Sequence, residues 1–311
     1  MPTSTAAPNT QVASTQVATT GESATATNAL AVPTYDLKIP EGGFTGINPS
    51  PEFVAVDKEG NAYIAGMDRR IVKLSPEGKV LATWNPEFSS SPGPEGIAVD
   101  ANGQIYVSDS GKQRVMVLSP EGSVLTSWQV PGDAEPRHSH LLAVVSQGGQ
   151  TSVYMTHYRS NRVLKYSSSG KLIMEWPSNS PTGVAVDGNG NVYVDDHDHG
   201  ALQKYSATGQ LLARWGVFGP EPGNFESPER VAVDEQGDVY VTDGGRNYRI
   251  QKLSPDGKLL AIWRTGVFYP AGIAVDRQGS IYVGGWNKDT ADASPYLIKI
   301  SPEGEVLARW R

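Results

Sequence analysis

The residues with the clearest capacity for chemistry are five histidines, which all fall between residues 138 and 199 of a 311-residue chain. His138 and His140 form one pair, His197 and His199 form a second, and His157 lies between them. Imidazole is the commonest protein ligand for transition metals such as Zn²⁺, Cu²⁺ and Fe²⁺. The crowding of these side chains therefore predicts a metal site, with zinc or another divalent metal favoured over calcium.

Aspartates accompany the second histidine pair. Asp196 and Asp198 alternate with His197 and His199 and are candidate ligands, or partners that orient an imidazole by a hydrogen bond. In an extended chain, residues separated by one position point to opposite sides. We therefore expect at most one histidine of each pair to face a shared centre.

The elements that must position these side chains belong to a repeating unit, and its most regular copy is residues 231–263. This copy reads VAVDEQGDVYVTDGGRNYRIQKLSPDGKLLAIW. Four β-branched runs are separated by turns rich in Asp, Gly and Pro, which predicts four short strands. The last strand ends in a tryptophan, and the same order recurs before Trp84, Trp128, Trp176, Trp215, Trp263 and Trp310.

The separation of these tryptophans, about 39 to 48 residues, is typical of four-stranded propeller blades. Six copies predict an all-β fold, a six-bladed β-propeller with four antiparallel strands per blade, over residues 33–311. The predicted blades are residues 51–84, 94–128, 136–176, 181–215, 228–263 and 270–310.

The strand order divides the predicted loops between two faces. The loops before the first strand and between the second and third strands share one face, which we call the top, and all five histidines fall there, in blades 3 and 4. The opposite face carries tight turns such as residues 57–61, whose Asp and Gly content we interpret as hairpin chemistry, because each turn offers too few carboxylates for calcium.

Departures from the repeat mark candidate functional loops. Arginine begins the third strand in four blades, where it can form an ion pair with an aspartate of the preceding loop such as Asp109 or Asp243. Blade 4 has Ala201 at this position. Blade 6 is expected to have an enlarged loop over residues 284–295, and blade 3 a long first turn over residues 146–152. The arginines that begin the third strand in the four blades that have one are Arg70, Arg114, Arg162 and Arg249.

Residues 1–32 are rich in Thr, Ser and Ala, with scarcely a large apolar side chain. Such a segment cannot bury enough surface to offset its ordering entropy, so we expect a disordered linker. It resembles the tether of an exported bacterial protein, which predicts a location at the cell surface, in the periplasm or outside the cell, with a membrane tether as one form. A cytoplasmic location is the alternative.

Residues 35–39 alternate as a strand does. We expect them to form an outer strand that latches the ring, either in competition with residues 306–310 or in addition to them.

Composition excludes several classes of function. A net charge of -7 and the lack of a basic run argue against nucleic-acid binding. No apolar run approaches the ~20 residues that span a bilayer. The chain has no cysteine, so disulfides and thiolate sites are excluded. The sequence has no Gly-x-Ser-x-Gly motif in a strand-turn-helix context, which argues against a serine hydrolase of that kind.

The pattern over residues 223–234, Gly-Asn-Phe-x-x-Pro-x-x-Val-Ala-Val-Asp, resembles the NHL repeat of six-bladed β-propellers. The segment around residues 136–143 is similar to one in peptidyl-α-hydroxyglycine α-amidating lyases. That resemblance implies His138 as a zinc ligand, His197 or His199 as another, and Tyr158 with Arg137 as catalytic candidates.

Two functions remain open at this stage. The first is a binding or sensing module whose top face takes a peptide, a glycan or a protein. The second is a metal-dependent lyase or hydrolase with its centre among the histidines. The candidate ligand-binding residues of the top face are Glu95, Glu229, Arg230, Arg246, Tyr248 and Trp286.

Overall fold

The computed structural model describes residues 32–37, 51–66, 68–89, 93–131, 141–266, 268–287 and 295–311. The chain divides into two units, residues 1–31 and 32–311, and every described residue belongs to the second. The predicted linker and the predicted site residues Arg137, His138 and His140 lie outside the described part.

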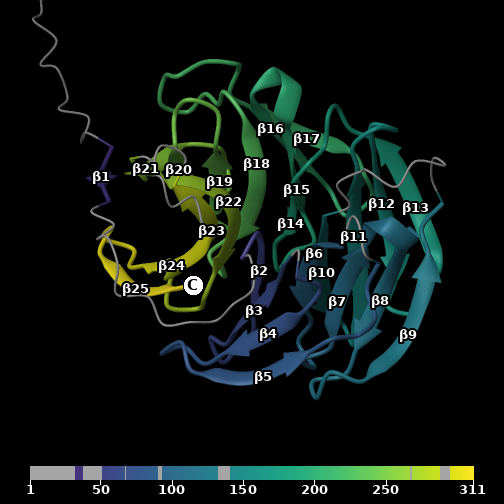
Figure 1. The fold of residues 1–311 in the computed structure, drawn as a ribbon. Coiled ribbons are helices and arrows are strands. Elements are labelled where there is room, and N and C mark those ends of the chain that lie inside the picture. Colours follow the sequence, from purple (N-terminus) through teal and green to yellow (C-terminus); the bar gives the residue numbers. More distant parts are fainter. Residues whose placement is uncertain are drawn as a thin grey trace, which may run out of the picture. The chain divides into compact units, whose positions relative to one another are not determined.

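Six sheets succeed one another along the chain, each with four consecutive antiparallel strands, and form the six blades of a β-propeller, which confirms the predicted fold class (Figure 1). Blade 1 consists of β2 Phe53–Val56, β3 Ala62–Ala65, β4 Ile71–Leu74 and β5 Val80–Trp84. Blade 2 consists of β6 Pro94–Val99, β7 Ile105–Asp109, β8 Arg114–Leu118 and β9 Val124–Gln129. Blade 3 consists of β10 Leu142–Gln147, β11 Gln150–His157, β12 Arg162–Ser167 and β13 Leu172–Pro177. Blade 4 consists of β14 Val184–Val186, β15 Val192–Asp196, β16 Ala201–Tyr205 and β17 Leu211–Trp215. Blade 5 consists of β18 Pro228–Val233, β19 Val239–Asp243, β20 Arg249–Leu253 and β21 Leu259–Arg264. Blade 6 consists of β22 Phe268–Val275, β23 Ile281–Asn287, β24 Tyr296–Ile300 and β25 Val306–Trp310. Two 3-10 turns, η1 Ser110–Lys112 and η2 His197–His199, lie in second-to-third-strand loops.

The aspartate turns at the bottom of blades 1, 2, 4, 5 and 6 are structural, as predicted. In blade 1, Oδ1 of Asp57 accepts hydrogen bonds from the backbone N–H groups of Glu59 (3.1 Å) and Asn61 (2.8 Å). Gly60 completes the turn at φ 83°, in the left-handed region that favours glycine. Both Asp57 oxygens are engaged inside the protein, because Oδ2 accepts from Asn61 and Tyr63. These turns therefore hold strand pairs together and leave little coordinating capacity for a cation.

Aromatic side chains at the outer strands join adjacent blades. Each indole lies over the turn glycine of the next blade, so tightly that a Cβ on that glycine would overlap it. The pairs are Trp84 on Gly122, Trp128 on Gly170, Trp176 on Gly209, Trp215 on Gly257 and Trp310 on Gly78. The repeated tryptophan is thus a blade-to-blade contact, which explains why its partner position is glycine.

The interface between blades 5 and 6 differs, because β1 Thr34–Asp36 forms its outer layer. This strand pairs in parallel with β21 of blade 5 and makes that sheet five-stranded. Tyr35 stacks on Trp263 at a ring-centroid distance of 5.8 Å and covers Gly304 of blade 6 in place of that tryptophan. The expected outer strand is therefore present, but its expected place at residues 306–310 of blade 6 is wrong, because Tyr35 stacks on Trp263 of blade 5.

Two expected loops are strand instead. Residues 146–152 of blade 3 form an extended hairpin whose turn is Gly148-Gly149, with both glycines at positive φ. In blade 6, β23 continues to Asn287, so the enlarged loop begins later than residue 284 and Trp286 is a strand residue paired with Tyr269. Both corrections have one cause, since cross-strand pairing extends a hairpin beyond the length of the repeat when the turn allows it.

Candidate functional site at the mouth of the central channel

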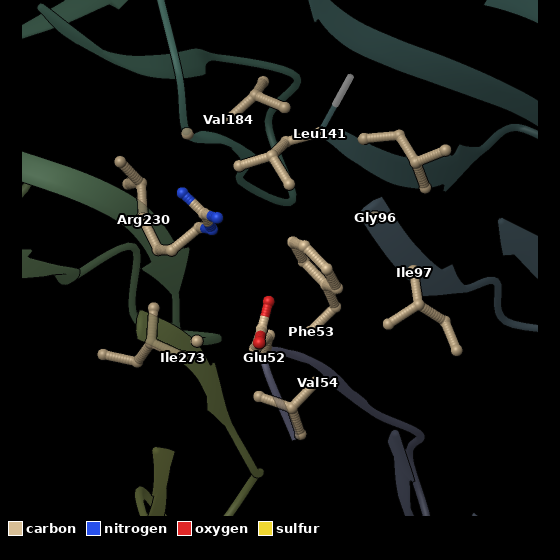
Figure 2. A pocket seen from close by; sticks show the side chains of 13 residues that line it. Glu52, Phe53, Val54, Gly96, Ile97, Leu141, Val184, Arg230 and Ile273 are labelled. Carbon is tan, nitrogen blue, oxygen red and sulfur yellow. The ribbon is translucent and has the colours of Figure 1, made fainter. Parts of the chain in front are cut away.

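The top ends of the innermost strands surround a cavity of about 60 Å³ (Figure 2). Equivalent positions of the six blades are Phe53, Gly96, Leu141, Gly183, Arg230 and Gly272, and they all line it. A Cβ at Gly183 would lie 2.9 Å from the Arg230 Cα, and one at Gly272 would lie 2.6 Å from the Glu52 carbonyl oxygen. Close approach of neighbouring blades thus requires glycine at positions 183 and 272. Among the residues that line this cavity, Arg230 is the only cation.

Arg230 carries the positive charge of the mouth. Its guanidinium lies 5.5 Å from the centroid of the Phe53 ring, and one terminal nitrogen donates to the Glu229 carbonyl at 2.8 Å. Its Nε is buried and has no hydrogen-bond partner among the described residues. Figure 2 shows the guanidinium and the Glu52 carboxylate both pointing into the cavity. Burial raises the pKa of Glu52, and the charge of Arg230 opposes that rise.

Glu229 connects the mouth to an aromatic group on blades 5 and 6. Burial raises the pKa of Glu229, while Arg230 and His197 oppose the rise. The hydroxyl of Tyr269 donates to the Glu229 carboxylate. Tyr269 also stacks on Trp286, with centroids 4.8 Å apart, and meets Tyr248 edge-on at 6.1 Å. Three predicted ligand-binding residues therefore surround Tyr269, which the sequence reasoning missed.

His197 is the predicted site histidine that turns toward a neighbouring blade. Its Nε2 lies 3.0 Å from the Ser227 hydroxyl of blade 5, and its Nδ1 lies 3.2 Å from Asp198. Asp198 also accepts from Ser180 at 2.7 Å and from the Tyr158 hydroxyl at 3.2 Å, and these bonds lower its pKa, the Ser180 bond most. Burial is the main cause that raises the pKa of Tyr158. This network joins blades 3, 4 and 5 across the top face.

The other two described histidines point elsewhere. His157 is buried at the end of β11, and its Nδ1 lies 2.7 Å from the Ser160 hydroxyl of its own loop. His199 pairs with the fully buried Asp196 at 2.7 Å, and Arg214 approaches the same carboxylate at 3.3 Å. Because residues 197–199 form the 3-10 turn η2, the assumption that this segment is extended is wrong, although its two histidines still diverge.

Among the residues that the structure describes, no group of three or more His, Cys, Asp or Glu side chains could hold a metal ion. The predicted metal set included His138 and His140, and the predicted catalytic pair included Arg137, all in the undescribed segment 132–140. The metal centre and that catalytic pair therefore stay predictions.

The remaining predicted residues have local partners. Glu95 accepts from the Ser110 hydroxyl at 2.6 Å, and the backbone N–H of Arg246 donates to Glu226 at 3.0 Å. The predicted arginine–aspartate pairs are present at Arg114–Asp109 (3.0 Å) and Arg249–Asp243 (3.1 Å). These contacts hold the top-face loops of blades 2 and 5 in place.

The most perturbed carboxyl group near the mouth is Asp195. It is fully buried between blades 4 and 5, and burial raises its pKa to about 7. Its Oδ1 accepts from the N–H groups of Thr182 and Gly183, both at 2.7 Å, and its Oδ2 lies 2.7 Å from the Thr182 hydroxyl. That hydroxyl also donates to the Glu229 carbonyl. A protonated Asp195 completes this network, because its O–H can donate to the Thr182 oxygen.

Asp195→Asn is expected to remove a pH dependence of stability. The folded-state pKa lies above the ordinary value of 3.8, so the folded chain holds the proton more tightly and stability falls as pH rises from about 4 through 7. The amide keeps the same hydrogen bonds without charge. We expect the variant to be more stable than the parent chain at pH 8 by on the order of 3 kcal/mol and nearly equal at pH 4.5. Urea unfolding at both pH values measures this, and parallel pH profiles for the two proteins would contradict it.

Comparisons with known proteins agree with this architecture. The NHL repeat family model matches residues 92–118 and 225–253, which lie in blades 2 and 5. The chain is therefore a six-bladed β-propeller that carries NHL repeats. The sequence matches none of the curated proteins with which it was compared. Among the described residues, no helix is long and apolar enough to cross a membrane.

Solved structures with a similar fold have diverse functions. A streptogramin B lyase is 18% identical, with a TM-score of 0.56 over 74% of each chain. Virginiamycin B lyase from Staphylococcus aureus is 11% identical, with a TM-score of 0.61 over 88% of each chain. The WD40 repeats of RRP9 are 14% identical, with a TM-score of 0.58 over 88% of this chain and 83% of that one. At these identities the likeness establishes the fold alone.

Proposed function

We propose that this propeller is a binding module whose channel mouth takes a free carboxylate at the end of a peptide ligand. The observation that carries the proposal is Arg230, a cation at the mouth whose buried Nε lacks a partner among the described residues. The end of the guanidinium points into the cavity, where it can donate to an incoming anion (Figure 2). Arginine also matches the planar geometry of a carboxylate.

The dimensions of the mouth favour an end group over a whole ligand. A volume of about 60 Å³ admits only a few non-hydrogen atoms. The rest of the ligand would lie on the top face, where Tyr158, Tyr248 and Trp286 offer aromatic surface. Aromatic side chains are enriched in peptide-binding surfaces because they contribute contact area at low entropic cost.

We also infer that the protein is exported. The support is the Thr-, Ser- and Ala-rich composition of residues 1–32, which resembles the tether of exported bacterial proteins. A top face presented outside the cell by such a tether suits a sensing or capture role. Fractionation of the source organism into medium, cell-surface, periplasmic and cytoplasmic fractions tests this location, and recovery of the protein in the cytoplasmic fraction alone would contradict it.

Arg230→Met is expected to weaken binding of free-acid peptides by about tenfold to a hundredfold, because a hydrogen bond to a charged group contributes roughly 1.5–3 kcal/mol. The probe is a pool of synthetic hexapeptides with free carboxyl ends, and the same pool amidated at that end is the comparison. Binding is read by mass spectrometry after capture on the full chain.

The matched control is Arg69→Met, which removes an exposed cation from the second-to-third-strand loop of blade 1, away from the residues that line the cavity. We expect this control to retain most of the binding. Equal capture of free-acid and amidated peptides, or full binding by Arg230→Met, would contradict the proposed function.

A further inference from the structure

We propose that Ser227, His197 and Asp198 form a nucleophilic site on the top face that accepts an acyl group from an activated ester. The Ser227 hydroxyl lies 3.0 Å from Nε2 of His197, and Nδ1 of the same ring lies 3.2 Å from Asp198. This is the order of contacts by which serine is activated in unrelated folds, where the site is recognised by geometry and not by sequence position. The site uses none of the cavity residues of the proposed peptide mouth.

Asp198, the carboxylate of this site, is held in position and stays ionised. Asp198 Oδ2 accepts from Ser180 at 2.7 Å, and the Tyr158 hydroxyl binds the same carboxylate. These hydrogen bonds keep its pKa below the ordinary range, so it stays ionised. An ionised partner at Nδ1 favours the tautomer with its proton on that nitrogen, which leaves the Nε2 lone pair directed at Ser227.

The surroundings stabilise the imidazolium that forms when His197 takes a proton. Its positive charge interacts favourably with Glu229 of β18 and with the ionised form of Asp195 of β15, in addition to Asp198. The ring edge faces Tyr158 of blade 3 at a centroid distance of 6.5 Å. Three carboxyl groups from two blades therefore surround one histidine, and the site exists only where blades 4 and 5 meet.

The reaction is an acyl transfer. The Ser227 oxygen forms a bond to the acyl carbon while its proton passes to His197 Nε2. The ester C–O bond then breaks, and the leaving oxygen takes the proton from His197. The product is an acyl-serine, which water hydrolyses by the same proton route in reverse.

The site is suited to covalent acylation more than to rapid turnover. The backbone N–H of Ser227 donates to Asp243 at 2.9 Å, so this N–H is not available to stabilise a tetrahedral oxyanion. Loss of such donors costs a factor of 10² to 10³ in rate in known hydrolases. We therefore expect one stable adduct per chain with reactive acylating or phosphonylating reagents, and only slow release.

A fluorophosphonate probe applied to the full chain tests the proposal, with intact mass and peptide mapping as readouts. We expect one adduct at Ser227. Ser227→Ala should abolish the adduct. His197→Gln should slow it by about 10² to 10⁴, the usual contribution of a general base. Asp198→Asn should lower the rate and change its pH profile, because Asp198 acts by positioning His197.

His199→Gln is the matched control, because His199 also pairs with an aspartate but no serine lies at its other nitrogen among the described contacts. It should label at the parent rate. Thermal unfolding of each variant establishes that it is folded. Unchanged labelling of either Ser227→Ala or His197→Gln would overturn the proposal, and so would the absence of any adduct on the folded parent chain. Peptide capture is measured separately, so a failure of labelling would contradict the nucleophilic site without contradicting the proposed peptide binding at Arg230.

Discussion

Gly122→Ala is expected to lower the free energy of unfolding by about 2–5 kcal/mol. Two costs combine at this position. Gly122 has φ 87°, which costs an L-residue roughly 1–2 kcal/mol, and the added Cβ would overlap the indole of Trp84 from the preceding blade. Overpacking of this kind typically costs about 1–3 kcal/mol. Urea denaturation followed by tryptophan fluorescence measures the loss.

Gly149→Ala is the matched control for that substitution. Gly149 also has a positive φ, 78°, but nothing lies within 4 Å of its missing Cβ. We expect it to cost only the backbone strain, about 1–2 kcal/mol. In a Trp84→Ala background, Gly122→Ala should fall to the same value, because the overlapping indole is gone. Equal costs for Gly122→Ala in both backgrounds would show that the blade contact is not the cause.

Arg249→Met is expected to destabilise the fold by about 3–5 kcal/mol, the usual cost of removing one partner from a buried ion pair. The Arg249 side chain is 7% exposed and its partner Asp243 is 0% exposed. Arg249 also donates to the carbonyls of Pro220 and Asn224, at 2.7 and 2.8 Å. The substitution therefore removes the counter-charge of a buried carboxylate and one donor from each of these carbonyls. Urea denaturation again gives the change in free energy.

The exposed counterpart of this pair provides the comparison. Arg70 and Asp68 of blade 1 are also in contact, at 2.6 Å, but their side chains are 33% and 27% exposed. Water can replace the lost contact there, so Arg70→Met should cost no more than about 1 kcal/mol. Adding Asp243→Asn to Arg249→Met should recover part of the loss, because it removes the uncompensated charge. A cost for Arg249→Met no greater than for Arg70→Met would contradict this account.

The top face owes its polar network to departures from the repeat. In blades 2 and 5 the aspartate at the end of the second strand is held by an arginine at the start of the third. Blade 4 has Ala201 there, and His199 and Arg214 hold Asp196 instead. In the same turn, η2, His197 contacts Ser227 of blade 5 instead of this carboxylate.

Much of the propeller follows from local sequence. The turn at Asp57 to Asn61 is determined by side-chain bonds within five residues and by a glycine at positive φ. Strand alternation and the position of each tryptophan are equally local, which is why six blades and most of their strands can be predicted. The same local reasoning finds the pairs Arg114–Asp109 and Arg249–Asp243, because their partners face each other across one hairpin.

Contacts between blades are different in kind, and only the tertiary structure decided them. Ser227 and Tyr269 occupy equivalent positions in their blades, each directly before a proline of an inner strand. Their positions in the sequence do not predict that Ser227 contacts His197 or that Tyr269 contacts Glu229. Likewise, β1 joins blade 5 because Tyr35 stacks on Trp263. Sequence periodicity specifies what each blade is, whereas the twist and approach of neighbouring sheets specify which side chains of different blades touch. The proposed nucleophilic site depends on one such contact, between His197 of blade 4 and Ser227 of blade 5.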